Sequence, residues 1–172
     1  MQQDSTEYEF QQPHLSVDAR VEDLLDRMTT AEKAGQLVGT WAGQLSEFND
    51  VADVKAAIRD HHIGAAATFG WGGSLDTTVD DVVETVNELQ TYAVEETRLG
   101  IPLLFNVDAV HGHAYVANAT VFPNGLGVGA TWDTDAAERA ASITAREIRA
   151  TGAHQNRSEE RRVGKECPSP CR

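Results

Sequence analysis

I-P-L-L-F-N-V-D-A-V-H-G-H, residues 101–113, is the stretch of this chain that decides its predicted fold. It opens with an apolar run bounded by a proline and a glycine, and a run this short is more typical of a buried strand than of a helix. Asp108, His111 and His113 follow the strand. In parallel α/β folds, ligands bind at the carboxyl ends of the strands. We therefore expect a ligand site at this strand end.

The rest of the chain alternates between predicted helices and short predicted strands. Helices are expected at 17–28, 29–38, 51–61, 79–98 and from Asp133 or Thr134 to Ala150, and strands at 37–41 and 65–69. Gly64 is expected to cap the third helix. Such alternation indicates a parallel sheet with right-handed crossovers. The few units expected here are too few to close an eight-stranded barrel, which takes about 250 residues. The predicted fold class is α/β, a partial TIM (β/α)8-type barrel with the first few βα units only.

Acidic residues outnumber basic residues, with 27 Asp and Glu against 14 Lys and Arg and a formal net charge of −13. Nucleic-acid binding needs a basic surface, so this balance argues against a nucleic-acid partner. It also argues against docking on anionic lipid, and no run approaches the roughly 20 apolar residues of a membrane span. An acidic chain with few lysines also suggests the hypothesis of adaptation to high salt.

The two ends of the chain differ from its middle. The amino terminus has neither the basic start nor the apolar core of a signal peptide, so the default location is cytoplasmic and an extracellular one stays open. Residues 157–167, R-S-E-E-R-R-V-G-K-E-C, resemble the in-frame translation of a short-read sequencing adapter; a natural charged tail is the alternative. We expect a flexible leader at 1–15, a folded part at 16–153 and a non-native, disordered tail at 154–172. Both cysteines fall in that tail and indicate nothing about a disulfide-stabilised core.

The polar residues after the central strand have several chemical interpretations. An acid placed directly after apolar strand residues must be paired or face a cavity, and Asp108 is suited to binding sugar hydroxyls through charge-assisted hydrogen bonds. His111 and His113 either satisfy loop backbone groups or act as the ligands of a metal-dependent barrel hydrolase. The glycines of 125–129 suggest a phosphate loop, but their spacing departs from that motif and tight turns are favoured. No serine or cysteine nucleophile motif is present.

Four blocks of the sequence resemble glycoside hydrolase family 3, in the order found in its amino-terminal barrel domain. They are V-E-D-L-L-D-R-M-T-T-A-E-K-A-G-Q-L (21–37), I-P-L-L-F-N-V-D-A-V-H-G-H (101–113), A-T-V-F-P-N-G-L-G-V-G-A-T-W-D (119–133) and R-E-I-R-A-T-G (146–152). The V-D-A-V-H-G form is similar to the β-glucosidase branch, whereas the branch that cuts N-acetylglucosaminides tends to read D-Q-E-G-G there.

The resemblance implies retaining hydrolysis of terminal, non-reducing β-D-glucosyl residues in a full-length parent, by two carboxyl groups about 5–5.5 Å apart. It places both catalytic carboxyl groups beyond these residues, so we expect no catalytic residue here and an inactive fragment. Asp108 is implied to bind the substrate, a β-glucoside or oligosaccharide. His111, Gly112 and His113 are implied to shape the strand-end turn, and neither a cofactor nor a metal is expected. A non-catalytic sugar-binding fragment is the alternative.

Overall fold

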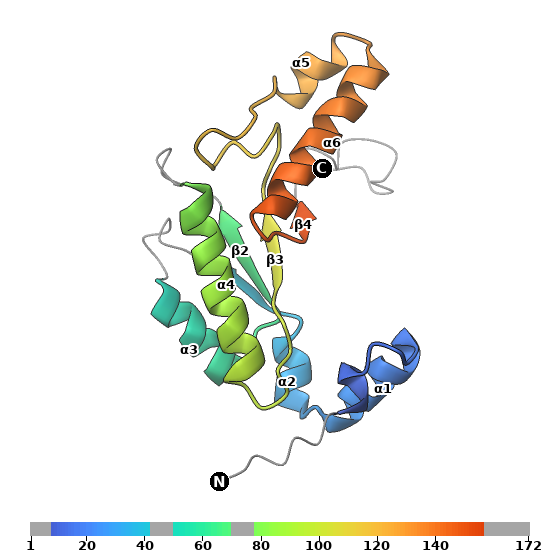
Figure 1. Cartoon of the computed structure of the whole chain (residues 1–172), viewed down its shortest axis with the longest axis vertical. Coiled ribbons are helices and arrows are strands. Elements are labelled where there is room, and N and C mark those ends of the chain that lie inside the picture. Colours follow the sequence, from blue (N-terminus) through green and yellow to red (C-terminus); the bar gives the residue numbers. More distant parts are fainter. Residues whose placement is uncertain (1–7, 42–49, 70–77, 157–172) are drawn as a thin grey trace, which may run out of the picture.

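The structure of the chain is a computed structural model, which describes residues 8–41, 50–69 and 78–156 (Figure 1). Helices and strands alternate along most of its length. In chain order, the elements are η1 (Glu9–Gln11), α1 (Val17–Arg27), α2 (Thr30–Gly35), β1 (Gly39–Trp41), α3 (Val51–His61), β2 (Ala65–Phe69), α4 (Val79–Glu95), β3 (Leu104–Val107), α5 (Gly125–Gly129), α6 (Thr134–Ala150) and β4 (Gln155–Asn156).

The strands form one four-stranded sheet in the order β1-β2-β3-β4, and every neighbouring pair is parallel. Helices α3 and α4 pack side by side on one face of this sheet (Figure 1). Helix α5 and the first turns of α6 extend beyond the carboxyl edge of the strands (Figure 1). This arrangement confirms the predicted α/β class and the first units of a (β/α)8-type barrel.

Polar side chains begin the helices where the sequence pattern predicts. Ser16 caps α1 by accepting from the Ala19 N–H at 3.2 Å. Thr29 and Glu32 form a capping box at α2, and Asp133 accepts from the Ala136 N–H at 2.9 Å to begin α6. These caps satisfy backbone N–H groups that have no partner within the first helical turn.

The end of α3 differs from the prediction. His62, not Gly64, adopts the left-handed conformation that ends the helix, with φ of 55°. Gly64 instead lies against the backbone of Gln36, where a Cβ atom would collide with the carbonyl oxygen. This glycine therefore permits close packing beside β2 rather than a helix cap.

The hydrophobic core lies between the sheet and the helices. The largest fully buried side chains of this cluster come from α3, α4 and β3 and are Val54, Leu89, Phe105 and Val107. Ile148 of α6 joins the same cluster. Among the helices of the described ranges, none combines the length and apolar character that a membrane span requires.

Both predicted terminal boundaries need correction. Residues 8–15 are not a flexible leader, because Phe10 is buried with Met28 and Leu99 in a second small cluster. The Phe10 N–H also donates to Asp23 at 3.0 Å, and Arg20 donates to the Phe10 carbonyl at 2.7 Å. At the other end, residues 154–156 belong to the fold, since β4 pairs with β3. Residues 1–7 and 157–172 lie outside the described residues.

Candidate functional site

Asp108 lies at the carboxyl end of β3, on the face of the sheet opposite the hydrophobic core. Phe105, Val107 and Ala109 point toward the helices and are at most 4% exposed. Because side chains alternate along a strand, Leu104 and Asp108 point the other way, and Leu104 is 44% exposed. Asp108 itself is partly buried, and its Oδ1 atom is inaccessible to solvent. The strand thus presents a carboxylate on the face that a closed barrel would enclose.

Gly112 allows the chain to turn back immediately after this strand. Its φ is +103°, and a Cβ atom there would collide with the carbonyl oxygen of Thr120. Gly112 also forms an isolated antiparallel bridge to Val121, and the carbonyl of His111 accepts from the Phe122 N–H at 2.7 Å. Since a side chain would be blocked by both backbone conformation and space, this position requires glycine.

His113 is a buried link between this turn and the end of α6. Its Nε2 atom lies 2.9 Å from the hydroxyl oxygen of Thr151, which itself donates to the carbonyl of Ile148 at 2.9 Å. The Thr151 hydroxyl proton is used in the bond to Ile148, so the hydroxyl oxygen accepts from His113. The imidazole of His113 therefore carries its proton on Nε2. Burial lowers the pKa of His113, and the negative charge of Glu147 opposes this effect only in part. His113 is therefore neutral near pH 7 and has a structural role in this conformation.

Glu147 makes a second connection between the loop and α6. Its carboxylate accepts from the Thr120 hydroxyl at 2.6 Å and from the Thr120 N–H at 3.0 Å. Thr120 is also the residue against which Gly112 packs. The segment that follows Asp108 is thus held by α6 at two points, His113 and Thr120.

The arrangement of the two histidines does not favour the metal-dependent alternative. The Nε2 atom of His113 is engaged with Thr151, and Nδ1 of His111 is buried without a hydrogen-bond partner among the described residues. Across 8–41, 50–69 and 78–156, no three His, Cys, Asp or Glu side chains come together as a cation site would require. We therefore derive no metal chemistry from this pair.

The glycine-spaced segment 125–129 forms the short helix α5, where tight turns were predicted. Its N-cap residue is Asn124, whose side chain accepts from the Gly127 N–H at 2.8 Å. The cap already uses one of the free N–H groups of this single helical turn, and we derive no phosphate site from the segment.

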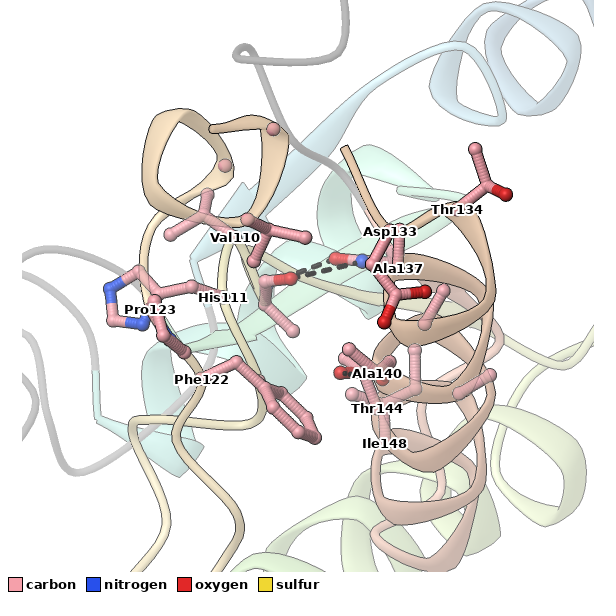
Figure 2. Close-up of a pocket in the computed structure, with 18 of the residues that line it drawn as sticks. Val110, His111, Phe122, Pro123, Asp133, Thr134, Ala137, Ala140, Thr144 and Ile148 are labelled. Atoms are coloured by element: carbon pink, nitrogen blue, oxygen red, sulfur yellow. Dashed lines mark hydrogen bonds between the residues drawn. The ribbon is translucent and has the colours of Figure 1, made fainter. Parts of the chain in front are cut away.

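A hollow of about 760 Å³ lies between the strand-end loop, α5 and α6. Figure 2 shows Phe122 and Pro123 on one side of it and Ala137, Ala140 and Ile148 on the other. Its wall is mostly apolar, and Asp108 is not among the residues that line it. The hollow and the Asp108 carboxylate are therefore separate features of the same edge of the sheet.

Asn156 is a residue of this edge that the sequence interpretation missed. Its Oδ1 accepts from the Ala109 N–H at 2.9 Å, and its Nδ2 donates to the Ala109 carbonyl at 3.1 Å. Two residues earlier, His154 makes a similar pair of bonds to Phe105, one through its backbone N–H and one through Nδ1. The available signal was the position of 153–156 after α6, where the alternating pattern calls for another strand.

Comparison with known proteins identifies the family. The family model described as "Glycosyl hydrolase family 3 N terminal domain" matches residues 29–168. The chain belongs to glycosyl hydrolase family 3. The matched range overlaps residues 157–167, so the proposed adapter origin of that segment stays a prediction.

Family 3 relatives resemble the chain in sequence and in structure. Over 78% of its length, the chain is 28% identical to the lysosomal beta glucosidase of Dictyostelium discoideum. Over 79% of its length, the chain is 33% identical to beta-glucosidase C of Emericella nidulans. An exo-1,3/1,4-beta-glucanase from a Pseudoalteromonas species superposes over 80% of the chain with a TM-score of 0.63 and 29% identity. The chain spans only 18%, 23% and 17% of these proteins, respectively.

Proposed function

We propose that Asp108 binds sugar hydroxyl groups and that the chain forms the sugar-holding part of a retaining β-glucosidase. The observation that carries this proposal is the position of Asp108. Its carboxylate lies at the carboxyl end of β3, on the face of the sheet opposite the hydrophobic core, in a chain that belongs to family 3. A carboxylate accepts short, charge-assisted hydrogen bonds, which suit the hydroxyl groups of a pyranose ring.

The substrate class comes from the relatives. Several carry names of β-glucosidases, and one solved relative is an exo-1,3/1,4-beta-glucanase. These names support a β-glucoside or a β-linked oligosaccharide as the substrate. The predicted cytoplasmic location remains a proposal, because two relatives are named lysosomal and periplasmic.

Hydrolysis with retention needs a nucleophile and an acid/base, with carboxyl groups about 5–5.5 Å apart. In our proposal both groups come from sequence outside these 172 residues, and Asp108 contributes substrate binding only. Any hydrogen bond that strengthens as the sugar ring flattens would also lower the barrier to reaction. The chain alone is therefore expected to bind a glucoside without hydrolysing it.

The test compares binding and turnover in the same preparation. Methyl β-D-glucopyranoside is titrated into the chain and followed by NMR, and hydrolysis of 4-nitrophenyl β-D-glucopyranoside is measured in parallel. We expect saturable shifts near Asp108, no turnover, and loss of about 1.5–3 kcal/mol of binding free energy in Asp108→Asn. Asp26→Asn makes the same change at an exposed site on α1 and should leave binding unchanged. Equal binding by the wild type and Asp108→Asn would contradict the proposal.

A further inference from the structure

The polar groups that hold the end of β3 in place come from the neighbouring strand. We infer that Asn156 is a positioning residue for Asp108: its amide binds both backbone groups of Ala109 and thereby fixes the strand end that carries the carboxylate. This inference rests on the proposed sugar-binding role of Asp108. In this inference Asn156 acts on the carboxylate through the backbone of Ala109 and not by binding the sugar itself.

The geometry places Asp108 between two points that Asn156 controls. Val107, the residue before it, is the register partner of Asn156 in the parallel β3–β4 pair. Ala109, the residue after it, receives both hydrogen bonds of the Asn156 side chain. On the opposite side of β3, the described pairing with β2 ends at Phe69 and Val107. Within the described residues, Asn156 is therefore the group that extends the hydrogen bonding of the sheet past Asp108.

The chemistry of the side chain fits this role. An asparagine amide carries a donor and an acceptor, so it reproduces the pattern that a further strand residue would offer. The N–H that it binds belongs to the peptide between Asp108 and Ala109, whose orientation sets the direction of the Asp108 side chain. Ala109 is only 4% exposed, and together with Asn156 it lines the hollow beside α6. Removal of the amide should let this peptide rotate until its polar groups are satisfied again.

His154 provides a matched comparison on the same strand. Its Nδ1 accepts from the Phe105 N–H at 3.1 Å, so it also connects a β4 side chain to the backbone of β3. That contact lies at the amino-terminal end of β3, three residues before Asp108. If Asn156 only stabilised the fold, loss of either side chain would have the same effect on sugar binding.

The experiment measures binding of methyl β-D-glucopyranoside to the 172-residue chain by NMR titration, at a temperature where urea curves show every variant to be folded. Asn156→Ala should raise the dissociation constant about tenfold, because a displaced binding group loses affinity even when it remains present. Asn156→Asp keeps the acceptor for the Ala109 N–H and should show a smaller rise. His154→Ala should change the dissociation constant by less than about twofold, since its contact lies away from the carboxylate. In the Asp108→Asn background, Asn156→Ala should add no further loss, because both changes act on one interaction.

Each outcome separates the two proposals. Loss of binding in Asp108→Asn but not in either Asn156 variant would overturn the positioning role and leave the sugar-binding role intact. Equal losses in Asn156→Ala and His154→Ala would also overturn it, because they would indicate a general effect of strand stability. Undiminished binding by Asp108→Asn, or no binding by the wild type, would overturn the proposed function itself. Should Asn156→Ala fail to fold, Asn156→Asp decides: it loses only the bond donated to the Ala109 carbonyl, and an unchanged dissociation constant in this variant would refute the inference.

Discussion

Glu32 offers a quantitative test of how the amino-terminal helices are joined to the sheet. Its carboxylate completes the capping box of α2 and binds Arg98, which precedes β3, at 2.6 Å and 3.0 Å. Arg98 also donates to the Arg27 carbonyl at 3.0 Å. One ion pair thus connects the end of α1, the start of α2 and the segment that leads into β3.

The hydrogen bonds from Arg98 are the main cause of a lowered pKa at Glu32, from an ordinary value of 4.5 to about 2, although burial opposes them. At about 1.4 kcal/mol for each pH unit, this corresponds to at most about 3.5 kcal/mol of stability. The side chain of Arg98 is 54% exposed and that of Glu32 is 11% exposed, so solvent screens the pair. We therefore expect a contribution of about 1–2 kcal/mol.

The sign of the pH dependence follows from the lowered pKa. The folded state holds Glu32 ionised more strongly than the unfolded state does, so the contribution is fully present above pH 4.5 and is lost as the pH falls from 4.5 toward 2. Glu32→Gln keeps the shape and the capping bond to Thr29 but removes the charge. Urea unfolding should therefore show a loss of about 1–2 kcal/mol for Glu32→Gln at pH 7 and a much smaller loss near pH 2.5.

Glu84→Gln is the matched control, because Glu84 is an exposed residue of α4. Its urea midpoint should equal that of the wild type at both pH values. A Glu32→Gln variant as stable as the wild type at pH 7 would refute the reasoning. A loss of the same size at pH 7 and pH 2.5 would show that the effect comes from packing rather than from charge.

Three further predictions concern stability. Gly112→Ala should destabilise the chain by about 2 kcal/mol or more in urea unfolding, because the added Cβ would collide with the Thr120 carbonyl at a residue with positive φ. Gly129→Ala should not destabilise the chain, because its Cβ would meet nothing within 4 Å. Burial lowers the pKa of His113, so the wild type should lose stability as the pH falls below about 6.5. His113→Gln should remove this part of the pH dependence, whereas His61→Gln, at an exposed position, should retain it. Finally, a net charge of −13 predicts that the thermal midpoint rises with potassium chloride concentration; a flat response would contradict salt adaptation.

Local sequence signals predicted much of the fold. The capping residues Ser16 and Thr29 placed two helix starts, because a cap depends on atoms within one turn. The apolar run that ends at Val107 placed β3 because both its length and its boundaries are local. Asp108 was selected as a candidate ligand-binding residue for the same reason, because it directly follows that run, and its role stays a proposal.

The missed features depend on contacts between distant parts of the chain. The two residues of β4 are too few to show any periodicity, and Asn156 is recognisable only through its bonds to Ala109, 47 positions away. Phe10 falls in the segment predicted as a flexible leader, yet it is buried with Met28 and Leu99. Gly64 was interpreted as a cap because its approach to Gln36 is invisible in the sequence.

The turn after Asp108 also limits how this edge of the sheet can be redesigned. Gly112 has no room for a side chain, and His113 fills a buried position with its hydrogen bond to Thr151 already assigned. Val110 and His111 are only partly buried, and both line the neighbouring hollow. Sequence libraries that reshape this hollow should therefore diversify positions 110 and 111 and keep 112 and 113 constant. Two adjacent pairs of residues in one short loop thus differ sharply in how much variation they can accept.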